Sequence, residues 1–141
     1  MKNILIDAGP LIALFDKSDQ YHQSAVSFLK TFEGQLFTTW PVITEVSHML
    51  DFSTKAQTDL LEWMSRGGLQ LFPLDESSAY RLMALTKKFD DVPMDLADAS
   101  LIIASEELNI LEIASIDSDF YVYRTIRNDY LTNIFPLMKN A

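Results

Sequence analysis

The N-terminal part of the chain contains the segment NILIDAGPLIALF at residues 3–15. Its first apolar run, NILI, ends at Asp7, and Gly9 and Pro10 then precede a second apolar run. A short apolar run bounded by turn residues is typical of a buried strand, and proline suits the first turn of a helix. The segment therefore predicts a strand followed at once by a helix.

The same order of strand and helix repeats along the chain, since QLFTT and LQLFPL are further apolar runs that precede helix-start signals. The predicted strands are residues 3–6, 35–39, 69–74 and 111–116, with a short edge strand near 133–137, where Pro136 weakens pairing. The predicted helices are residues 10–15, 20–32, 41–50, 54–66, 95–109 and one that ends at residue 89. Ser18 or Asp19 is the predicted cap of the helix 20–32, and Asp75 or Ser77 is the predicted cap of the helix that ends at residue 89.

Strands that alternate with helices predict an α/β fold, in which right-handed crossovers produce a mainly parallel sheet covered by helices on both faces. We expect four or five strands in a three-layer α/β/α sandwich. Ligands of such sheets bind outside the carboxyl ends of the strands, where the strand order reverses. Acidic residues directly after a strand are therefore the first candidates for a functional site.

The composition predicts one folded domain over residues 1–141, because 48% of the chain is apolar and 22% is charged. There is no cysteine, which excludes disulfides, thiolate nucleophiles and cysteine-bound metals. The N-terminal sequence MKNILIDAGP lacks the features of a signal peptide, and no stretch reaches the roughly 18 apolar residues of a membrane span. We therefore expect a cytoplasmic protein.

The charge balance is strongly acidic, with 20 Asp and Glu against 11 Lys and Arg and a formal net charge of -9. Such a charge argues against avid, nonspecific binding of nucleic acid. The two histidines, His22 and His48, are too few and too far apart to build a metal site. Any metal would therefore be bound by carboxylates.

Two acidic residues lie beside apolar residues that are expected to be buried. Asp7 directly follows the first predicted strand, and a carboxylate at the edge of a core must be paired, used as a helix cap or bound to metal. Glu45 lies between apolar residues of the helix PVITEVSHML. For Asp7 the alternative role is a helix cap, and for Glu45 it is an ordinary exposed position.

Asp98 is the clearest case, because its helix LADASLIIA is apolar on nearly every side. Asp95 precedes it by one turn, and like charges at this spacing are destabilising unless a cation neutralises them. The alternative is that Asp95 caps the helix and Asp98 interacts with the helix dipole. Asp117 and Asp119 follow the fourth predicted strand, in the position that Asp7 has after the first, although such a turn is also ordinary loop chemistry.

These acids predict one oxygen-only cluster at the edge of the sheet, formed by Asp7, Glu45, Asp98 and Asp117. Oxygen ligands suit the hard cations Mg²⁺ and Mn²⁺, which keep several waters and remain open to phosphate oxygens. The chemistry that follows is metal-assisted hydrolysis.

The chain resembles PIN domains, and in particular the bacterial VapC-type toxin ribonucleases. The matching segments are ILIDAGPLIALFD, TEV, MDLADASLIIASEEL and IASIDSDF. The resemblance implies an α/β/α sandwich and Mg²⁺- or Mn²⁺-dependent endonuclease action on RNA. It assigns the catalytic metal site to Asp7, Glu45, Asp98 and Asp117, with Asp95 and Asp119 as weaker candidate ligands. It also implies a homodimer and a small antitoxin partner.

Basic residues are the candidates for local contacts with RNA phosphates, although each also suits solvated surface. They are Lys17, Lys87, Lys88, Arg124 and Arg127.

Two alternatives come from other functional classes. In a noncatalytic interaction module, aromatic residues such as Trp40, Phe52, Trp63 and the run at 120–123 would form contacts with a protein partner. In a receiver-like phospho-acceptor domain, Asp75 would follow the third strand as the phosphorylated residue. Metal dependence separates the first alternative from a nuclease, and labelling of Asp75 would support the second.

Overall fold

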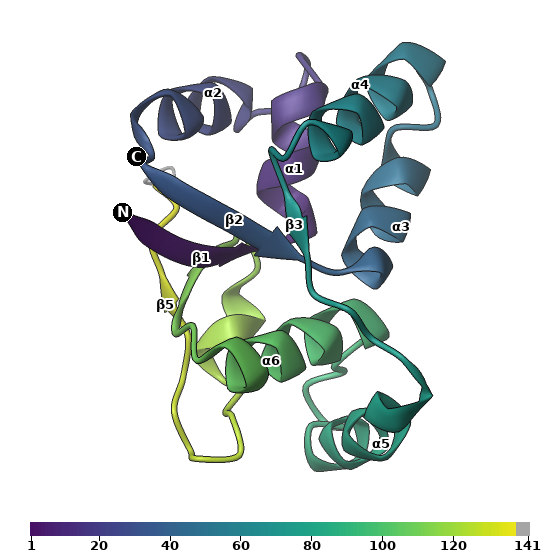
Figure 1. The fold of residues 1–141 in the computed structure, drawn as a ribbon, viewed down its shortest axis with the longest axis vertical. Helices are drawn as coiled ribbons and strands as arrows, with labels where there is room; N and C mark the ends of the chain where they lie inside the picture. The colour runs from purple at the N-terminus through teal and green to yellow at the C-terminus, as the bar shows by residue number, and fades with distance from the viewer. Residues whose placement is uncertain (138–141) are drawn as a thin grey trace.

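The computed structural model describes residues 1–137, which form a twisted sheet with helices on both sides (Figure 1). In these residues the sheet has five strands in the order β3-β2-β1-β4-β5, and all pairs are parallel. The strands are β1 (Lys2–Ile6), β2 (Gly34–Thr38), β3 (Gln70–Leu71), β4 (Glu112–Ala114) and β5 (Thr132–Asn133). The predicted α/β fold with a mainly parallel sheet is confirmed.

Helices form the two outer layers, with α1 to α4 on one side of the sheet and α5 and α6 on the other (Figure 1). The helices are α1 (Ala8–Phe15), α2 (His22–Thr31), α3 (Trp40–Met49), α4 (Thr54–Ser65), α5 (Ala79–Lys88) and α6 (Leu96–Leu108). Two 3₁₀ turns are η1 (Glu76–Ser78) and η2 (Ser118–Tyr121). Within the described chain, none of the helices combines the length and the apolar character that crossing a membrane requires.

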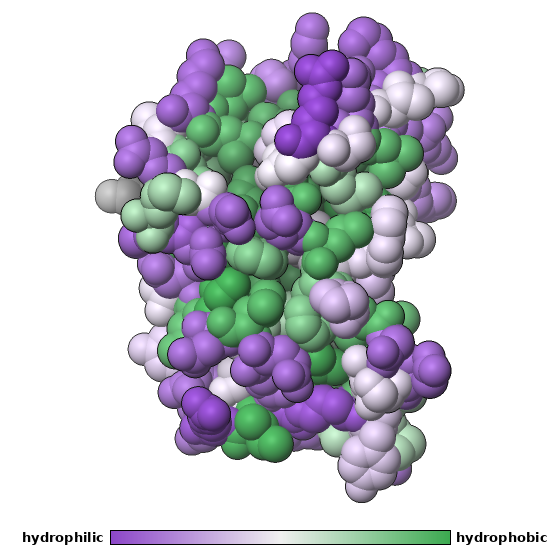
Figure 2. All heavy atoms as spheres, viewed as in Figure 1, coloured by the Kyte–Doolittle hydropathy of each residue, from purple (hydrophilic) through white to green (hydrophobic). Residues whose placement is uncertain are grey.

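The core lies where the sequence is most continuously apolar. The last three residues of β1 are buried, and this strand is central in the sheet, covered on both faces. Residues 97–105 of α6 are all buried, as expected for a helix that is apolar on every side. Hydrophilic side chains dominate the outer ends of the molecule, whereas apolar side chains appear between the two helical layers (Figure 2).

The first helix begins at Ala8, two residues earlier than predicted, so Gly9 lies in its first turn together with Pro10. Proline is tolerated there because the first amide groups of a helix have no partner within the helix. A Cβ on Gly9 would lie 3.1 Å from the side chain of Ile116. Glycine therefore lets the start of α1 approach the segment that follows β4.

Three predicted strands are shorter in the structure. β3 covers two residues of the predicted 69–74, because Pro73 has no amide hydrogen and the backbone bond from Phe72 to Thr38, at 2.9 Å, is the last on this edge. β4 ends at Ala114 because the amide of Ser115 donates to a side chain. β5 ends at Asn133, before the weakening residue Pro136.

The predicted cap of the second helix is also displaced. The helix begins at His22, and Asp19 accepts a hydrogen bond from the amide of Tyr21 at 2.8 Å, in the turn before the helix. Ser18 does not cap the helix, because its hydroxyl and amide both donate to Asp16. In contrast, Asp75 does cap η1, as its carboxylate accepts from the amide of Ser77.

Candidate metal centre

The topology brings together acids that are far apart in the sequence. β1 and β4 are neighbours, although their residues are more than a hundred positions apart, and the strand order reverses between them. Asp7 directly follows β1, and Asp117 lies three residues after the end of β4. Helix α6 leads into β4, so its N-terminus with Asp98 lies at the same edge of the sheet.

The centre of the site consists of Asp7, Asp98 and Asp117. One carboxylate oxygen from each of these residues lies within 4.8 Å of the others. Asp7 and Asp98 are buried, with 6% and 7% of their surface exposed, whereas Asp117 is exposed to solvent. Two buried carboxylates thus lie beside a third that is open to an incoming ligand.

Ser115 connects two of these acids. The backbone of Asp7 continues the ladder between β1 and β4 by donating to the carbonyl of Ala114 at 3.0 Å. This places the Asp7 carboxylate beside Ser115, whose hydroxyl donates to Asp7 Oδ2 at 3.1 Å and accepts from the amide of Asp117 at 2.9 Å. One buried hydroxyl therefore orients the residues that follow both strands.

The third acid is held at the start of α6 by a capping box. The amide of Asp98 donates to Asp95 Oδ1 at 2.7 Å, and the amide of Asp95 donates to Asp98 Oδ2 at 3.4 Å. The capping role that was the alternative for Asp95 is therefore confirmed. Asp98 Oδ2 also accepts a hydrogen bond from the hydroxyl of Tyr123 at 3.1 Å. Capping and metal binding are compatible, because the cap uses one carboxylate oxygen.

Burial and the charges of neighbouring acids raise the pKa of Asp7 and of Asp98, the two buried carboxylates. Burial raises the pKa of Asp7 from 3.8 to about 7, against hydrogen bonds from Ala8 and Ser115, and the charges of Glu45 and Asp117 add to the increase. The pKa of Asp98 is raised first by burial and then by the charges of Asp95 and Asp7. Ionising the buried acids of the cluster is thus unfavourable, because it places negative charges close together in a buried site.

The acids line a cavity of about 280 Å³, and Glu45 of α3 and Asp95 lie at its wall. Burial, Asp95 and Asp117, in that order, raise the pKa of the Glu45 carboxylate. The described residues that line this cavity include five acids and no Lys, Arg or His. A divalent cation fits this donor set, because it would neutralise the carboxylates and because Mg²⁺ and Mn²⁺ prefer oxygen ligands.

Other predicted site residues lie outside this cavity. Asp119 is not among the residues that line it, although its amide donates to Asp117 Oδ1 at 2.9 Å. None of the predicted phosphate contacts lines it either, namely Lys17, Lys87, Lys88, Arg124 and Arg127.

The guanidinium of Arg124 donates to the carbonyls of Tyr121 and Val122 and lies 5.1 Å from the ring centre of Tyr130. Arg127 lines a separate, larger groove.

The aromatic residues considered for a protein interface have different environments. Trp40 and Phe52 are exposed, whereas Phe120 and Tyr123 are buried. The run at 120–123 therefore divides between core and surface and does not form one aromatic patch.

Three residues that organise the site were not predicted from the sequence, namely Ser115, Tyr123 and Asn133. Asn133 of β5 accepts from the amide of Ser115 at 3.0 Å and donates to its carbonyl at 2.9 Å. Its side chain thus replaces a strand partner where β4 ends. The signal in the sequence was a polar residue within a predicted strand, which applies to Ser115 and Asn133. The sequence around Tyr123 contains no comparable signal.

The family model described as "PIN domain" matches residues 4–125, and the chain therefore belongs to the PIN domain family. This excludes the receiver-like alternative, and Asp75 lies outside the acidic cavity. No curated protein sequence matches the chain significantly.

Two solved structures share the fold. One is the Mycobacterium tuberculosis toxin VapC20, described as cleaving the sarcin-ricin loop, with 15% identity and a TM-score of 0.76 over 84% of this chain and 93% of that one. The other is VapBC2 from Rickettsia felis, bound to a DNA fragment from its promoter, with 12% identity and a TM-score of 0.61 over 94% of this chain and 98% of that one.

Proposed function

We propose that this protein is a Mg²⁺- or Mn²⁺-dependent endoribonuclease and the toxin of a toxin–antitoxin pair. The observation that carries the proposal is the cavity lined by five acids and by no basic residue among the described positions. Membership of the PIN domain family and the fold shared with two VapC-type structures support the nuclease class.

In this proposal Asp7 and Asp98 bind the cation directly, and Asp117 and Glu45 complete the site directly or through water. Bound there, the cation would supply Lewis-acid activation of the scissile phosphate and of the attacking water. Ser115 keeps Asp7 and the chain at Asp117 in place through its two hydrogen bonds. Asp95 fixes the first turn of α6 and adds negative charge at the wall of the cavity.

The charges also predict an order of binding. An RNA phosphate is repelled by the five acids of the cavity until a cation neutralises them. Because the pKa of Asp7 is about 7 without metal, cation binding displaces protons at neutral pH. Both the affinity for RNA and the cleavage of RNA should therefore depend on the divalent cation.

For partners, we propose an RNA substrate, a small antitoxin protein and a homodimer, and we propose that the protein acts in the cytoplasm. The description of the Rickettsia felis structure as a VapBC2 assembly on promoter DNA supports an antitoxin partner. The description of VapC20 as a toxin that cleaves the sarcin-ricin loop supports an RNA substrate. The strongly acidic composition makes a basic segment of the antitoxin a suitable occupant of the acidic edge.

The test is cleavage of total cellular RNA by purified protein with Mg²⁺, Mn²⁺ or EDTA. Wild type should cleave RNA with either cation and lose this activity in EDTA, and Asp7→Asn should not cleave in any condition. A matched control is Asp90→Asn, which changes an exposed acid outside the cavity and should cleave like wild type. Equal cleavage by Asp7→Asn and wild type would contradict the proposal. Absence of both cleavage and Mn²⁺ binding in wild type would favour the noncatalytic interaction module.

A further inference from the structure

Tyr123 is a buried tyrosine whose hydroxyl reaches the acidic cluster. No part of its side chain is exposed. Its ring packs edge-on against Phe89 and Phe120, with both ring centres 5.3 Å away. Its hydroxyl donates to Asp98 Oδ2 at 3.1 Å. The aromatic neighbours therefore hold the ring, and the ring presents one donor to one carboxylate.

The three central carboxylates share a pattern in their hydrogen bonds. Each has one oxygen that accepts from the protein: Oδ2 of Asp7 from Ser115, Oδ1 of Asp117 from the amide of Asp119, and Oδ2 of Asp98 from Tyr123. Within residues 1–137, the other oxygen of Asp98 and of Asp117 accepts no side-chain or backbone hydrogen bond of the protein, whereas Asp7 also has a backbone hydrogen bond from Ala8. Asp98 and Asp117 thus each keep one oxygen for a cation.

Asp98 needs its side-chain donor more than the other two acids do. Its capping bond from the amide of Asp95 is long, at 3.4 Å, and bonds of this length are weak. The terminal torsion of an aspartate is broad, so a single weak bond leaves the carboxylate free to turn. The charges of Asp95 and Asp7 repel Asp98 and favour such a turn when no cation is bound.

We propose that Tyr123 is a positioning residue for the metal centre, whose hydroxyl fixes Oδ2 of Asp98 so that Oδ1 remains available to the cation. This inference rests on the proposed function, because it assumes that Asp98 is a metal ligand. Tyr123 touches neither the cation nor the substrate and acts through Asp98. Partners of this kind orient metal ligands, and their loss commonly weakens metal binding by about 10- to 100-fold.

The test is the affinity of Tyr123→Phe for Mn²⁺, measured by titration calorimetry on protein first stripped of metal. The variant keeps the packed ring and removes only the hydroxyl. We expect the Kd for Mn²⁺ to rise about 10- to 100-fold. At saturating Mn²⁺ we also expect kcat for RNA cleavage to fall with KM for RNA little changed, and the electron paramagnetic resonance spectrum of bound Mn²⁺ to change.

Two control variants separate the hydroxyl from the packing. Tyr121→Phe removes the hydroxyl of an exposed tyrosine two residues away and should bind Mn²⁺ like wild type. Phe89→Leu removes one of the two aromatic neighbours that hold the ring but keeps Phe120 and the hydroxyl, so it should raise the Kd for Mn²⁺ less than Tyr123→Phe does. Thermal unfolding in EDTA checks that all three variants are folded.

Unchanged Mn²⁺ affinity in Tyr123→Phe would overturn the inference while leaving the proposed function in place. An equal loss of affinity in Phe89→Leu would also overturn it, because packing and not the hydroxyl would then be responsible. Absence of Mn²⁺ binding by wild type is a different result, since it contradicts the proposed metal centre itself.

Discussion

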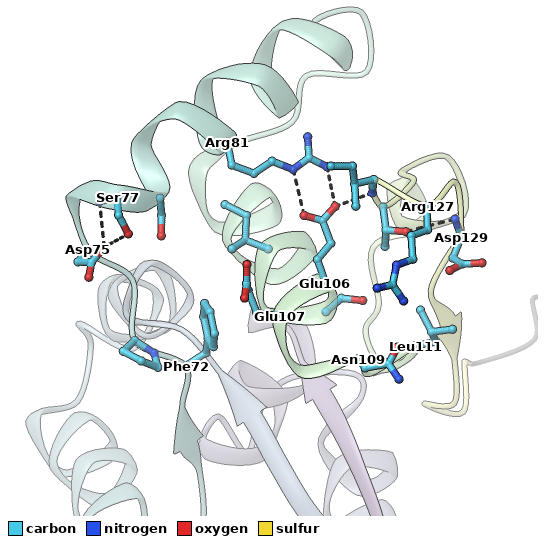
Figure 3. Close-up of a pocket in the computed structure, with 16 residues that line it drawn as sticks. Phe72, Asp75, Ser77, Arg81, Glu106, Glu107, Asn109, Leu111, Arg127 and Asp129 are labelled. Atoms are coloured by element: carbon cyan, nitrogen blue, oxygen red, sulfur yellow. Dashed lines mark hydrogen bonds and ion pairs between the residues drawn. The ribbon is translucent and has the colours of Figure 1, made fainter.

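Two cavities of this protein hold charged groups in opposite ways. The acidic cavity of about 280 Å³ contains like charges, and no basic residue of the described chain lines it. A larger groove of about 670 Å³ lies between α5, the C-terminal half of α6 and the loop of residues 125–129 (Figure 3). There Arg81 Nε donates to Glu106 Oε1 at 3.0 Å, and Glu106 Oε2 accepts from the amide of Ile126 at 2.6 Å.

The difference shows that the candidate metal centre is distinguished by unneutralised charge and not by volume. In the larger groove, the carboxylate of Glu106 accepts hydrogen bonds from Arg81 and from the backbone amide of Ile126. It therefore connects α5, α6 and the loop of residues 125–129. In the acidic cavity, burial raises the pKa of Asp7 and of Asp98. The contacts of Glu106 therefore connect parts of the fold, whereas the ionised acids of the acidic cavity repel one another.

The largest effect should come from Asp98→Asn, which removes one central carboxylate. We expect RNA cleavage and Mn²⁺ affinity to fall by more than about 100-fold. That value is the upper end of the loss expected when a residue that only orients a metal ligand is removed. In EDTA the variant should be as stable as wild type or more stable, because repulsion with Asp95 and Asp7 is relieved. Cleavage assays and thermal unfolding measure the two effects, and an active variant would remove Asp98 from the metal centre.

The pH dependence of stability should distinguish metal-free from metal-bound protein. The pKa of Asp7 is about 7 in the folded state against an ordinary value of 3.8, so its ionisation opposes folding. Metal-free stability should therefore fall as pH rises from about 4 to about 7, by at most about 4 kcal/mol from this group. Mn²⁺ binds the ionised carboxylates, so its stabilising effect should grow over the same range.

Thermal unfolding in EDTA and in Mn²⁺ across this pH range measures the prediction. Asp7→Asn should flatten the metal-free curve, because the amide does not titrate in this range and gains no negative charge as pH rises. A metal-free protein that becomes more stable between about pH 4 and about pH 7 would show that other groups outweigh Asp7.

Arg81→Ala should affect stability and leave the metal centre unchanged. The change leaves Glu106 with the amide of Ile126 as its remaining partner, and the side chain of Glu106 is only 11% exposed. We expect unfolding to become easier by about 1 to 3 kcal/mol, with unchanged Mn²⁺ affinity. Arg66→Ala is the matched control, because its pair with Glu62 is exposed on one helix and should contribute little. Weaker Mn²⁺ binding in Arg81→Ala would mean that the two cavities are coupled.

The smallest effect should come from Lys87→Ala combined with Lys88→Ala, at the end of α5. Neither lysine lines the acidic cavity, so cation binding should not change. If both contact RNA phosphates, the slope of log affinity against log salt concentration should become shallower by about 1.4 for a single strand. Filter binding at several salt concentrations with a catalytically inactive variant measures this slope. An unchanged slope would exclude this lysine pair from the RNA-binding surface.

Much of the architecture and the central acids were predictable because their signals are local. The run NILI followed by Asp7 predicted a buried strand with a carboxylate at its end, and the apolar helix around Asp98 made that charge conspicuous. The lengths of β3 and β4 were not predictable to the same degree. Pro73 shortens one strand, and the side chain of Asn133 replaces a backbone partner of the other.

The residues that support the site were harder to predict, because their partners are distant in the chain. Tyr123 bonds to Asp98 across 25 positions, and Asn133 bonds to Ser115 across 18. A tyrosine in an aromatic run and an asparagine near a chain end have many ordinary roles, so neither pattern indicates a partner. Arg124 was predicted to contact RNA phosphates because it is basic. In the structure its guanidinium donates to nearby backbone carbonyls.

The amino-acid sequence by itself determined the alternation of strands and helices and the placement of Asp7 and Asp117 after strands, because hydrophobic periodicity and turn residues act over a few positions. Only the tertiary structure decided that Asp7, Asp98 and Asp117 lie within 4.8 Å of one another and that Arg81 neutralises Glu106. Strand order and helix packing set these distances, and they depend on contacts between residues that are remote in the chain.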